Sequence, residues 1–201
     1  MVKYDKKKGE IIEAGIKAFA AYGYYKTTLE DIAQMLGMKK NSLYYYFKNK
    51  EDLFREIIMS DVDEHFASQE RILAKNISNA KKIEEILLDV MRFIRTRTSK
   101  YSVKLSTYLE FSAVVKREFS EFNTRQCKII ETLIKNGIKS GEFRKVNAKQ
   151  VSKDMGELVP ALVNNAYLNS DAVFVHDVEF EEIVKRVRRV VRYVINGMKN
   201  K

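Results

Sequence analysis

Residues 28–50 read TLEDIAQMLGMKKNSLYYYFKNK, and this stretch decides the fold class of the chain. Thr28 followed by Asp31 is typical of a capping box that opens a short helix. Gly37 ends that helix after about two turns, and another short helix is predicted over residues 40–47. A short helix, a glycine turn and a second short helix predict a helix-turn-helix, the geometry with which many proteins enter the major groove of DNA.

The helix after the glycine turn has the composition of a DNA-reading surface. The segment 39–50 contains four lysines and no acidic residue. Leu43 and Phe47 are four residues apart, so both are expected to face the core while their neighbours face outward. Lysine pairs with guanine or phosphate, asparagine with adenine, and a tyrosine ring contacts a thymine methyl. The alternative is a basic surface helix that enters no groove, and the capped helix before it argues against that. The predicted DNA contacts here are Lys39, Lys40, Asn41, Ser42, Tyr44 and Tyr45.

The composition of the whole chain agrees with a helical, polyanion-binding protein. The 201 residues are 45% hydrophobic, with one proline and eight glycines, which favours an all-α fold over a many-turned β fold. The net charge of +10 favours nucleic acid or an anionic membrane surface as partner. No apolar run approaches the roughly 18 residues of a membrane span, and the first residues lack the apolar core of a signal peptide. We expect a cytoplasmic protein with no membrane partner.

Residues for catalysis or metal binding are not recognisable in the sequence. Cys127 is the only cysteine, which excludes an internal disulfide and a cysteine-rich zinc site. His65 and His176 are far apart and are expected to be exposed helix residues. Phosphate loops, nucleophile elbows and paired metal-ligand motifs are not found. The sequence therefore predicts no catalytic residue, no metal and no cofactor, and it disfavours a helical enzyme.

Apolar periodicity predicts about nine helices in two units. A helix-turn-helix domain of three helices is expected over 1–49, and a larger helical domain for effector binding and dimerisation over 50–201. A long helix that begins at Lys50 links the two halves. The remaining predicted helices cover about 5–21, 81–98, 100–115, 118–140, 148–169 and 177–198.

The last predicted helix carries two neighbouring apolar rows. One row holds Ile183, Val187, Val190 and Val194, and the other holds Val184, Val191, Ile195 and Met198. One row can cover the core of the domain while the other meets a twin subunit; the alternative is a helix buried entirely within one chain. The predicted dimer contacts are Val184, Val187, Val191 and Ile195.

Aromatic residues and methionines between the two ends are candidates for an effector cavity. The alternative for each of them is a place in an ordinary core. Pro160, inside an otherwise helical pattern, is expected to kink or interrupt its helix. The predicted lining residues are Phe66, Phe93, Tyr101, Tyr108, Phe111, Met155 and Tyr167.

The residues from about 9 to 57 resemble the DNA-binding domain of TetR-family regulators. The resemblance rests on many spaced matches, among them YGY at 22–24, TTLEDIA at 27–33, LGM at 36–38, LYYYF at 43–47 and NKEDL at 49–53. It implies that Thr28, Tyr44 and Lys50 hold phosphates. It also implies that Lys40, Asn41, Ser42 and Tyr45 approach bases.

Two residues depart from the family's pattern. Lys39 stands where the family often has serine, so the recognition helix is expected to lack its usual N-cap. Glu30 stands where some relatives have an arginine that contacts bases, and it is left out of the predicted site.

The resemblance implies a ligand-responsive repressor that binds palindromic double-stranded operator DNA as a homodimer and is released by a small effector. The aromatic and methionine content and the positive charge of the chain favour an apolar or amphipathic effector. The alternative function is a DNA-binding protein without an effector, which acts architecturally or through a protein partner.

Overall fold

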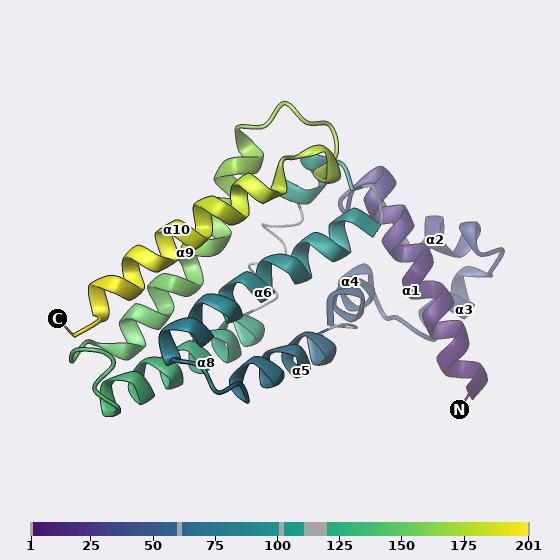
Figure 1. Ribbon diagram of the computed structural model, residues 1–201. Coiled ribbons are helices and arrows are strands. Elements are labelled where there is room, and N and C mark those ends of the chain that lie inside the picture. The colour runs from purple at the N-terminus through teal and green to yellow at the C-terminus, as the bar shows by residue number, and fades with distance from the viewer. Residues whose placement is uncertain (1, 60–61, 101–102, 111–119, 201) are drawn as a thin grey trace.

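The computed structural model describes residues 2–59, 62–100, 103–110 and 120–200. The described part is an elongated all-α molecule, with the N-terminal helices at one end and the C-terminus at the other (Figure 1). It contains nine α-helices and one 3₁₀ helix, and residues 105–110 are helical as well. The prediction of an all-α chain is confirmed.

Four helices build the N-terminal unit: α1 (Val2–Tyr22), α2 (Leu29–Met35), α3 (Lys40–Tyr44) and α4 (Lys50–Met59). The capping box predicted at the start of α2 is present, because the Asp31 amide donates to Thr28 Oγ1 at 3.2 Å and the Thr28 amide donates to the Asp31 carboxylate at 2.8 Å. Gly37 between α2 and α3 has a φ of 61°, which a glycine adopts without strain. The helix-turn-helix is therefore built by local sequence signals.

The core of the N-terminal unit extends beyond the predicted boundary at residue 49. Leu53, Phe54 and Ile57 of α4 are buried in the same apolar cluster as Ile11 and Leu43. By packing, α4 belongs to this first unit, because its apolar stripe covers α1.

The larger unit contains α5 (Val62–Leu73), α6 (Asn79–Lys100), α8 (Ser120–Lys139), α9 (Ala148–Leu168), the 3₁₀ helix η1 (Val175–Asp177) and α10 (Phe180–Met198). α6 runs along the long axis of the unit, with α8, α5 and α10 packed around it (Figure 1). The single helix predicted from residue 50 to 75 is instead two helices, α4 and α5. α9 continues through Pro160, which is exposed, so the proline does not interrupt the helix.

α10 buries a different set of side chains from either row predicted for it. Its buried stripe is Phe180, Ile183, Val187, Val191, Ile195 and Met198, which faces α6 and α9 of the same chain. Three of the four predicted dimer contacts, Val187, Val191 and Ile195, are 0–4% exposed and belong to the protomer core. Their assignment to an interface is corrected, because a side chain enclosed by its own chain cannot contact a partner. Val184 is half-buried and lies on the flank next to α6.

Candidate nucleic-acid interface

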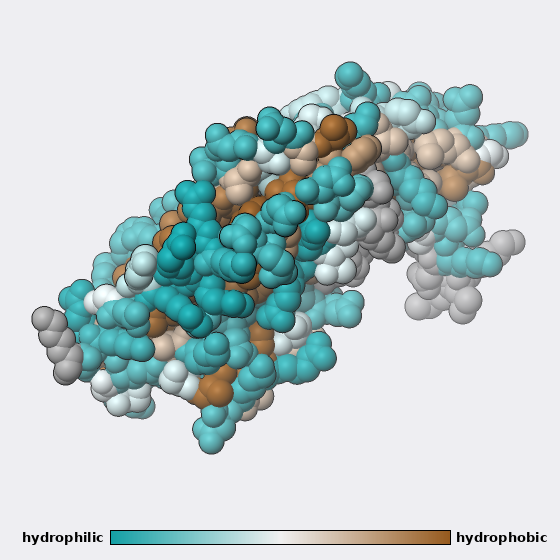
Figure 2. Space-filling view, turned by 45° about the horizontal axis from the view of Figure 1, so that its top comes forward, coloured by the Kyte–Doolittle hydropathy of each residue, from teal (hydrophilic) through white to brown (hydrophobic). Residues whose placement is uncertain are grey.

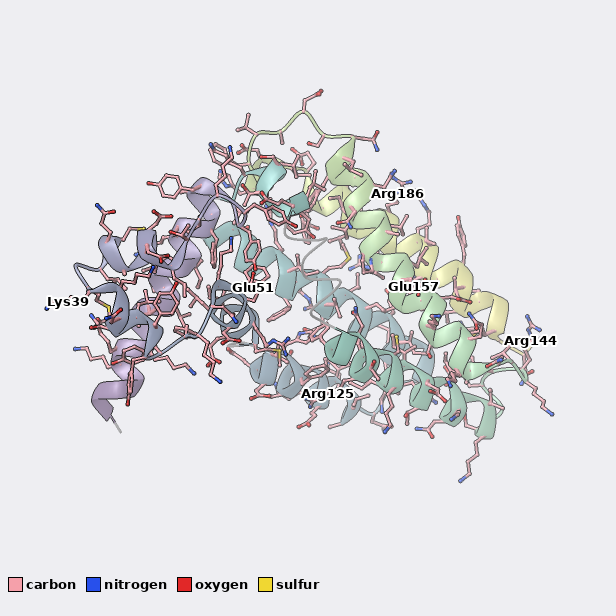
Figure 3. The ribbon with its side chains drawn as sticks, turned by 180° about the vertical axis from the view of Figure 1, so that it is seen from behind. Lys39, Glu51, Arg125, Arg144, Glu157 and Arg186 are labelled. Carbon is pink, nitrogen blue, oxygen red and sulfur yellow. The ribbon has the colours of Figure 1, made fainter. Side chains whose placement is uncertain are left out.

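The outer face of α3 presents the side chains that the sequence assigned to DNA. Leu43 and Phe47 are 0% and 4% exposed, as predicted from their spacing, and both anchor the helix to the first core. Tyr45 is 75% exposed, although an aromatic ring gains by burial. Figure 3 shows Lys39 at the tip of the N-terminal unit, directed away from the rest of the molecule. The exposed residues of this face are Lys39, Lys40, Asn41, Ser42, Tyr44 and Tyr45.

The first turn of α3 has no side-chain cap, as the sequence predicted from a lysine at this position. The Lys39 side chain makes no capping hydrogen bond, and its backbone is extended at φ −69° and ψ 140°. The amide groups of the first turn therefore have no partner from the capping residue's side chain. The Ser42 and Leu43 amides donate to the Lys39 carbonyl oxygen at 2.9 and 3.4 Å, and the exposed side chains of Lys39 and Lys40 make this end of the helix positively charged.

Glu30 of α2 is joined to α3, which the sequence did not indicate. Its carboxylate forms an ion pair with Lys40 and accepts a hydrogen bond from the Tyr44 hydroxyl at 3.3 Å. The hydrogen bond from Lys40 lowers the pKa of Glu30, so the carboxylate is ionised at neutral pH. One of the two lysines at the start of α3 is thus partly neutralised by an acid on the same face.

Thr28 and Lys50, two of the three predicted phosphate contacts, have partners inside the protein. The Thr28 hydroxyl takes part in the capping box with Asp31. The Lys50 ammonium donates to the carbonyl oxygens of Tyr24 at 2.8 Å and Tyr25 at 3.4 Å, and it lies 4.5 Å from the centre of the Tyr24 ring. Through these contacts Lys50 links the turn after α1 to the first residue of α4. The sequence could not indicate this contact, because its partners are about 25 residues away.

Four of the seven residues predicted to line an effector cavity fall into two aromatic groups. Phe66 and Phe93 each pack against the His65 ring, with centroids 5.3 and 4.6 Å away. Tyr108 and Tyr167 meet edge to face at 4.8 Å, and burial raises the pKa of both phenols.

The other predicted lining residues are Met155, which is buried in the core of the larger unit, and Tyr101 and Phe111, which lie outside the described residues. Two hollows, of about 450 and 740 Å³, lie instead beside α6 and α10. They are lined by other residues, several of them arginines such as Arg92 and Arg188.

The expectation that His65 is an exposed helix residue is wrong. His65 is 4% exposed and stands beside three more buried polar side chains, Gln69, Asp89 and Gln126. A signal for this was available, because His65 and Gln69 share the helical stripe of Val62 and Phe66. His176 is exposed, as expected. Within the described ranges, groups of three or more His, Cys, Asp or Glu side chains that could hold a metal ion are not found.

Comparison with known proteins gives consistent matches over both units. The family model "Bacterial regulatory proteins, tetR family" matches residues 11–57, and the model "QacR-like protein, C-terminal region" matches residues 102–200. The HTH-type transcriptional regulator YhgD of Bacillus subtilis is 25% identical over 79% of this chain and 83% of its own length. The negative transcriptional regulator IcaR of the biofilm operon in Staphylococcus epidermidis is 32% identical over 58% of this chain and 63% of its own.

The solved structures agree with the sequence matches. The crystal structure of a transcriptional regulator from Cytophaga hutchinsonii superposes with a TM-score of 0.69 at 25% identity, over 94% of this chain and 97% of that one. None of the described helices is long and apolar enough to cross a membrane.

Proposed function

The chain belongs to the TetR family of bacterial regulatory proteins, and we propose that it represses transcription by placing the α3 helices of a homodimer in successive major grooves of an operator. The observation that carries this proposal is the composition of the exposed face of α3. Lysine, asparagine, serine and tyrosine side chains stand outward there, on a helix that Leu43 and Phe47 anchor firmly to the core. A rigid helix with exposed hydrogen-bonding side chains is what reading of base edges requires.

Within this face we assign base reading and phosphate binding to different residues. Asn41 and Ser42 in α3 and Tyr45 directly after its last residue are exposed, and they are proposed to approach base edges. Lys39, exposed just before the helix, is proposed to bind a phosphate through its ammonium group. Lys50 acts indirectly in this proposal, because its ammonium orients the turn before α2.

Replacing Tyr45 with alanine tests the assignment of base reading. Since the side chain is 75% exposed, the free energy of unfolding should change by less than about 0.5 kcal/mol. The preference at one base pair of each half-site should fall by about 1–3 kcal/mol. The measurement is selection of sites from a random DNA pool by wild-type and variant proteins. Lys39→Ala is the matched control, and it should weaken all sequences alike and flatten the salt dependence by about one unit. If Tyr45→Ala also lost affinity uniformly, Tyr45 would not be a reader.

Glu30→Gln should strengthen binding to all DNA sequences. The substitution removes one negative charge from the DNA-facing surface and releases Lys40 from its ion pair, so one more phosphate can be neutralised. The slope of log affinity against log salt should steepen by about 0.9, which corresponds to about tenfold between 1 M and 0.1 M salt. Fluorescence anisotropy over a salt series measures both. Glu131→Gln on α8, which also breaks an ion pair with a lysine, should change neither. An unchanged slope in Glu30→Gln would mean that this carboxylate does not face DNA.

Dimerisation is proposed to use the outer face of α9 and α10. Apolar side chains that the protomer does not cover are found there: Tyr193 and Leu168 are 67% and 68% exposed, and Leu158 and Val190 are half-buried. The same pair of helices carries Glu157 and Arg186, whose opposite charges suit a two-fold symmetric contact (Figure 3). A dimer places two copies of α3 at a fixed spacing, which a palindromic operator matches.

Release by an effector requires a mechanical link between the two units, and one direct contact supports such a link. The Tyr25 amide, in the turn between α1 and α2, donates to the Glu110 carboxylate at 3.0 Å. Glu110 belongs to the helical residues 105–110 of the larger unit. A shift of this segment on effector binding would therefore pull on the turn that precedes the helix-turn-helix. The effector must bind the two arrangements with different affinity, since equal affinity shifts nothing.

A further inference from the structure

Three cationic side chains converge on one carboxylate between α6 and α10. The Arg192 guanidinium donates to both carboxylate oxygens of Glu84, at 3.0 and 3.2 Å. Arg188 Nε lies 3.5 Å and Lys81 Nζ 3.7 Å from the same group. The Glu84 side chain is 8% exposed, whereas the three cationic side chains are 42–56% exposed. The acid therefore lies beneath the cations, whose outer sides face solvent.

Glu85, the next residue, has a similar arrangement on the side of α5. Its carboxylate pairs with Nζ of Lys75, just after α5, at 2.7 Å. The hydrogen bond from Lys75 lowers the pKa of Glu85, burial opposes this, and the nearby charges of Lys75, Lys81 and Arg92 lower the pKa further. Four cations thus surround two adjacent acids. We call these four the cation cluster: Lys75, Lys81, Arg188 and Arg192.

The cation cluster lines the hollow of about 740 Å³, where α6 lies between α5 and α10 (Figure 1). Among the described residues that line it, six are cationic and four are acidic. Besides Glu84 and Glu85, the acids are Asp89, whose buried Oδ2 lies 3.4 Å from His65 Nδ1 in the interior, and Glu181, which is exposed at the start of α10. The lining therefore has a surplus of two positive charges, which a dianion would neutralise.

The two helices beside the cluster run in opposite directions. Glu84 of α6 is paired with Arg192 near the end of α10. Arg95, later in α6, places its guanidinium 4.9 Å from the ring centre of Phe180, the first residue of α10. Residues that follow Glu84 in α6 therefore lie beside residues that precede Arg192 in α10.

Apolar side chains continue the hollow on one side of the cation cluster. Leu88 comes one helical turn after Glu84, and Val184 comes one turn before Arg188. Because the helices are antiparallel, both lie on the same side of the cluster, in the direction of Phe180. All three apolar side chains line the hollow, and Leu88 and Val184 are half-buried. The hollow is thus cationic at one end and partly apolar beyond it.

We propose that this hollow binds the effector, and that the effector is an amphipathic dianion. Its charged group contacts the cation cluster, and its apolar part lies against Leu88, Val184 and Phe180. Guanidinium and ammonium groups both bind phosphate oxygens, so a phosphate monoester has a suitable charge. The inference rests on the proposed function, in which a small molecule controls DNA binding. It adds a charge and a place to the apolar or amphipathic effector expected from the sequence.

The walls of the hollow lead to both functional surfaces of the protein. α5 follows closely after α4, which shares the apolar core of the DNA-binding unit. α10 carries part of the face proposed for dimerisation. An anion that contacts Lys75 on one wall and Arg188 on the other restrains α5 relative to α10, and thereby the position of α4. Operator affinity changes if the anion binds one arrangement of these helices more tightly than the other.

Three compounds test the proposal on the full-length protein. Octyl phosphate carries about 1.5–2 negative charges at neutral pH, as phosphoserine does. Octyl sulfate has the same chain and a single charge, and ethyl phosphate has the dianion without the long chain. Isothermal titration calorimetry should give octyl phosphate an affinity at least about fivefold above octyl sulfate and at least about tenfold above ethyl phosphate. Equal affinity in either pair would overturn the amphipathic dianion, and octyl phosphate that does not bind would overturn the site itself.

Arg188→Gln places the binding in this hollow. The substitution removes one cation of the cluster, while Glu84 keeps Arg192 and Lys81 as partners. The preference for octyl phosphate over octyl sulfate should then fall to within about twofold. Lys128→Gln removes the same charge from an exposed position on α8 outside the lining, and it should keep the preference. A preference that survives in Arg188→Gln would overturn the assignment. If circular dichroism shows that this variant does not fold, Lys81→Gln tests the same cluster with the same expected loss.

Fluorescence anisotropy with a site selected from a random DNA pool tests the role as effector. Saturating octyl phosphate should lower the affinity for this site by at least about fivefold, the lower end of usual allosteric coupling. An unchanged affinity would overturn the effector role. The measurement without any compound separates the two proposals. A protein that selects no DNA site contradicts the repressor, whereas one that binds DNA but not octyl phosphate contradicts only this inference.

Discussion

Val190→Arg is expected to separate the dimer and thereby abolish tight operator binding. Val190 is half-buried on the flank of α10 that carries Arg186 and Tyr193, one helical turn away in either direction. In a two-fold interface the substitution occurs twice and places unpaired charges in a region that would exclude water. A loss of about 4 kcal/mol corresponds to about a thousandfold in the dimer dissociation constant. Sedimentation equilibrium measures the dissociation constant, and a gel shift on full and half operators measures the consequence for DNA.

Val184→Arg is the matched control for this experiment. Both valines are half-buried on the same helix, but Val184 lies on the opposite flank, beside α6 and the hollow that Arg188 also lines. This variant should remain a dimer. If Val184→Arg dissociated while Val190→Arg did not, the interface would lie on the α6 flank instead. If both variants remained fully dimeric, α10 would not be part of the interface. Figure 2 shows hydrophobic side chains in a broken strip along the larger unit, between hydrophilic ones.

Gly137→Ala is expected to be the most destabilising single-methyl substitution among the described glycines. Gly137 lies in α8, where alanine normally stabilises a helix by about 1 kcal/mol relative to glycine. Here a Cβ would overlap with the ring of Phe143, whose side chain is 1% exposed. The ring has little freedom to move, because the residue after it is held by a hydrogen bond from the Arg144 amide to the Met198 carbonyl at 2.8 Å.

At position 137 alanine should therefore lower the free energy of unfolding relative to glycine, which is the reverse of the usual preference in a helix. Overpacking of this kind costs about 1–3 kcal/mol, and for a chain of this length the midpoint of thermal unfolding should fall by about 2–4 °C for each kcal/mol. Gly9→Ala in α1 is the control, since a Cβ there meets nothing within 4 Å and the variant should be slightly more stable. Chemical denaturation gives both free energies of unfolding. A Gly137→Ala protein as stable as the wild type would mean that Phe143 is not enclosed between α8 and α10.

Much of the DNA-binding unit could be predicted because its signals are local. The capping box of Thr28 and Asp31 spans three residues, and the burial of Leu43 and Phe47 follows from a spacing of four. Because these two side chains face the core, the other side chains of α3 face outward. The missing cap at Lys39 could also be predicted, because capping depends on the type of a single residue.

The contacts that join separate helices could not be predicted. Lys50 holds carbonyl groups about 25 residues away, and Glu110 bonds to an amide 85 residues away. The two apolar rows of the last helix were recognised, but which side chains face the protomer depends on where α6 and α9 lie. His65 lies on the same helical stripe as Val62 and Phe66, but the stripe alone does not indicate that α6 and α8 enclose it.

The sequence by itself determined the helical class, the helix-turn-helix and the chemistry of its outer face, because helix periodicity, caps and turns depend on residues within four positions of one another. Only the tertiary structure decided which stripe of α10 is core, that Lys50 donates to the Tyr24 carbonyl oxygen, and that His65, Gln69, Asp89 and Gln126 are buried together. The physical reason is that an apolar or polar stripe specifies the side of a helix to be covered. What covers it depends on how distant helices pack together.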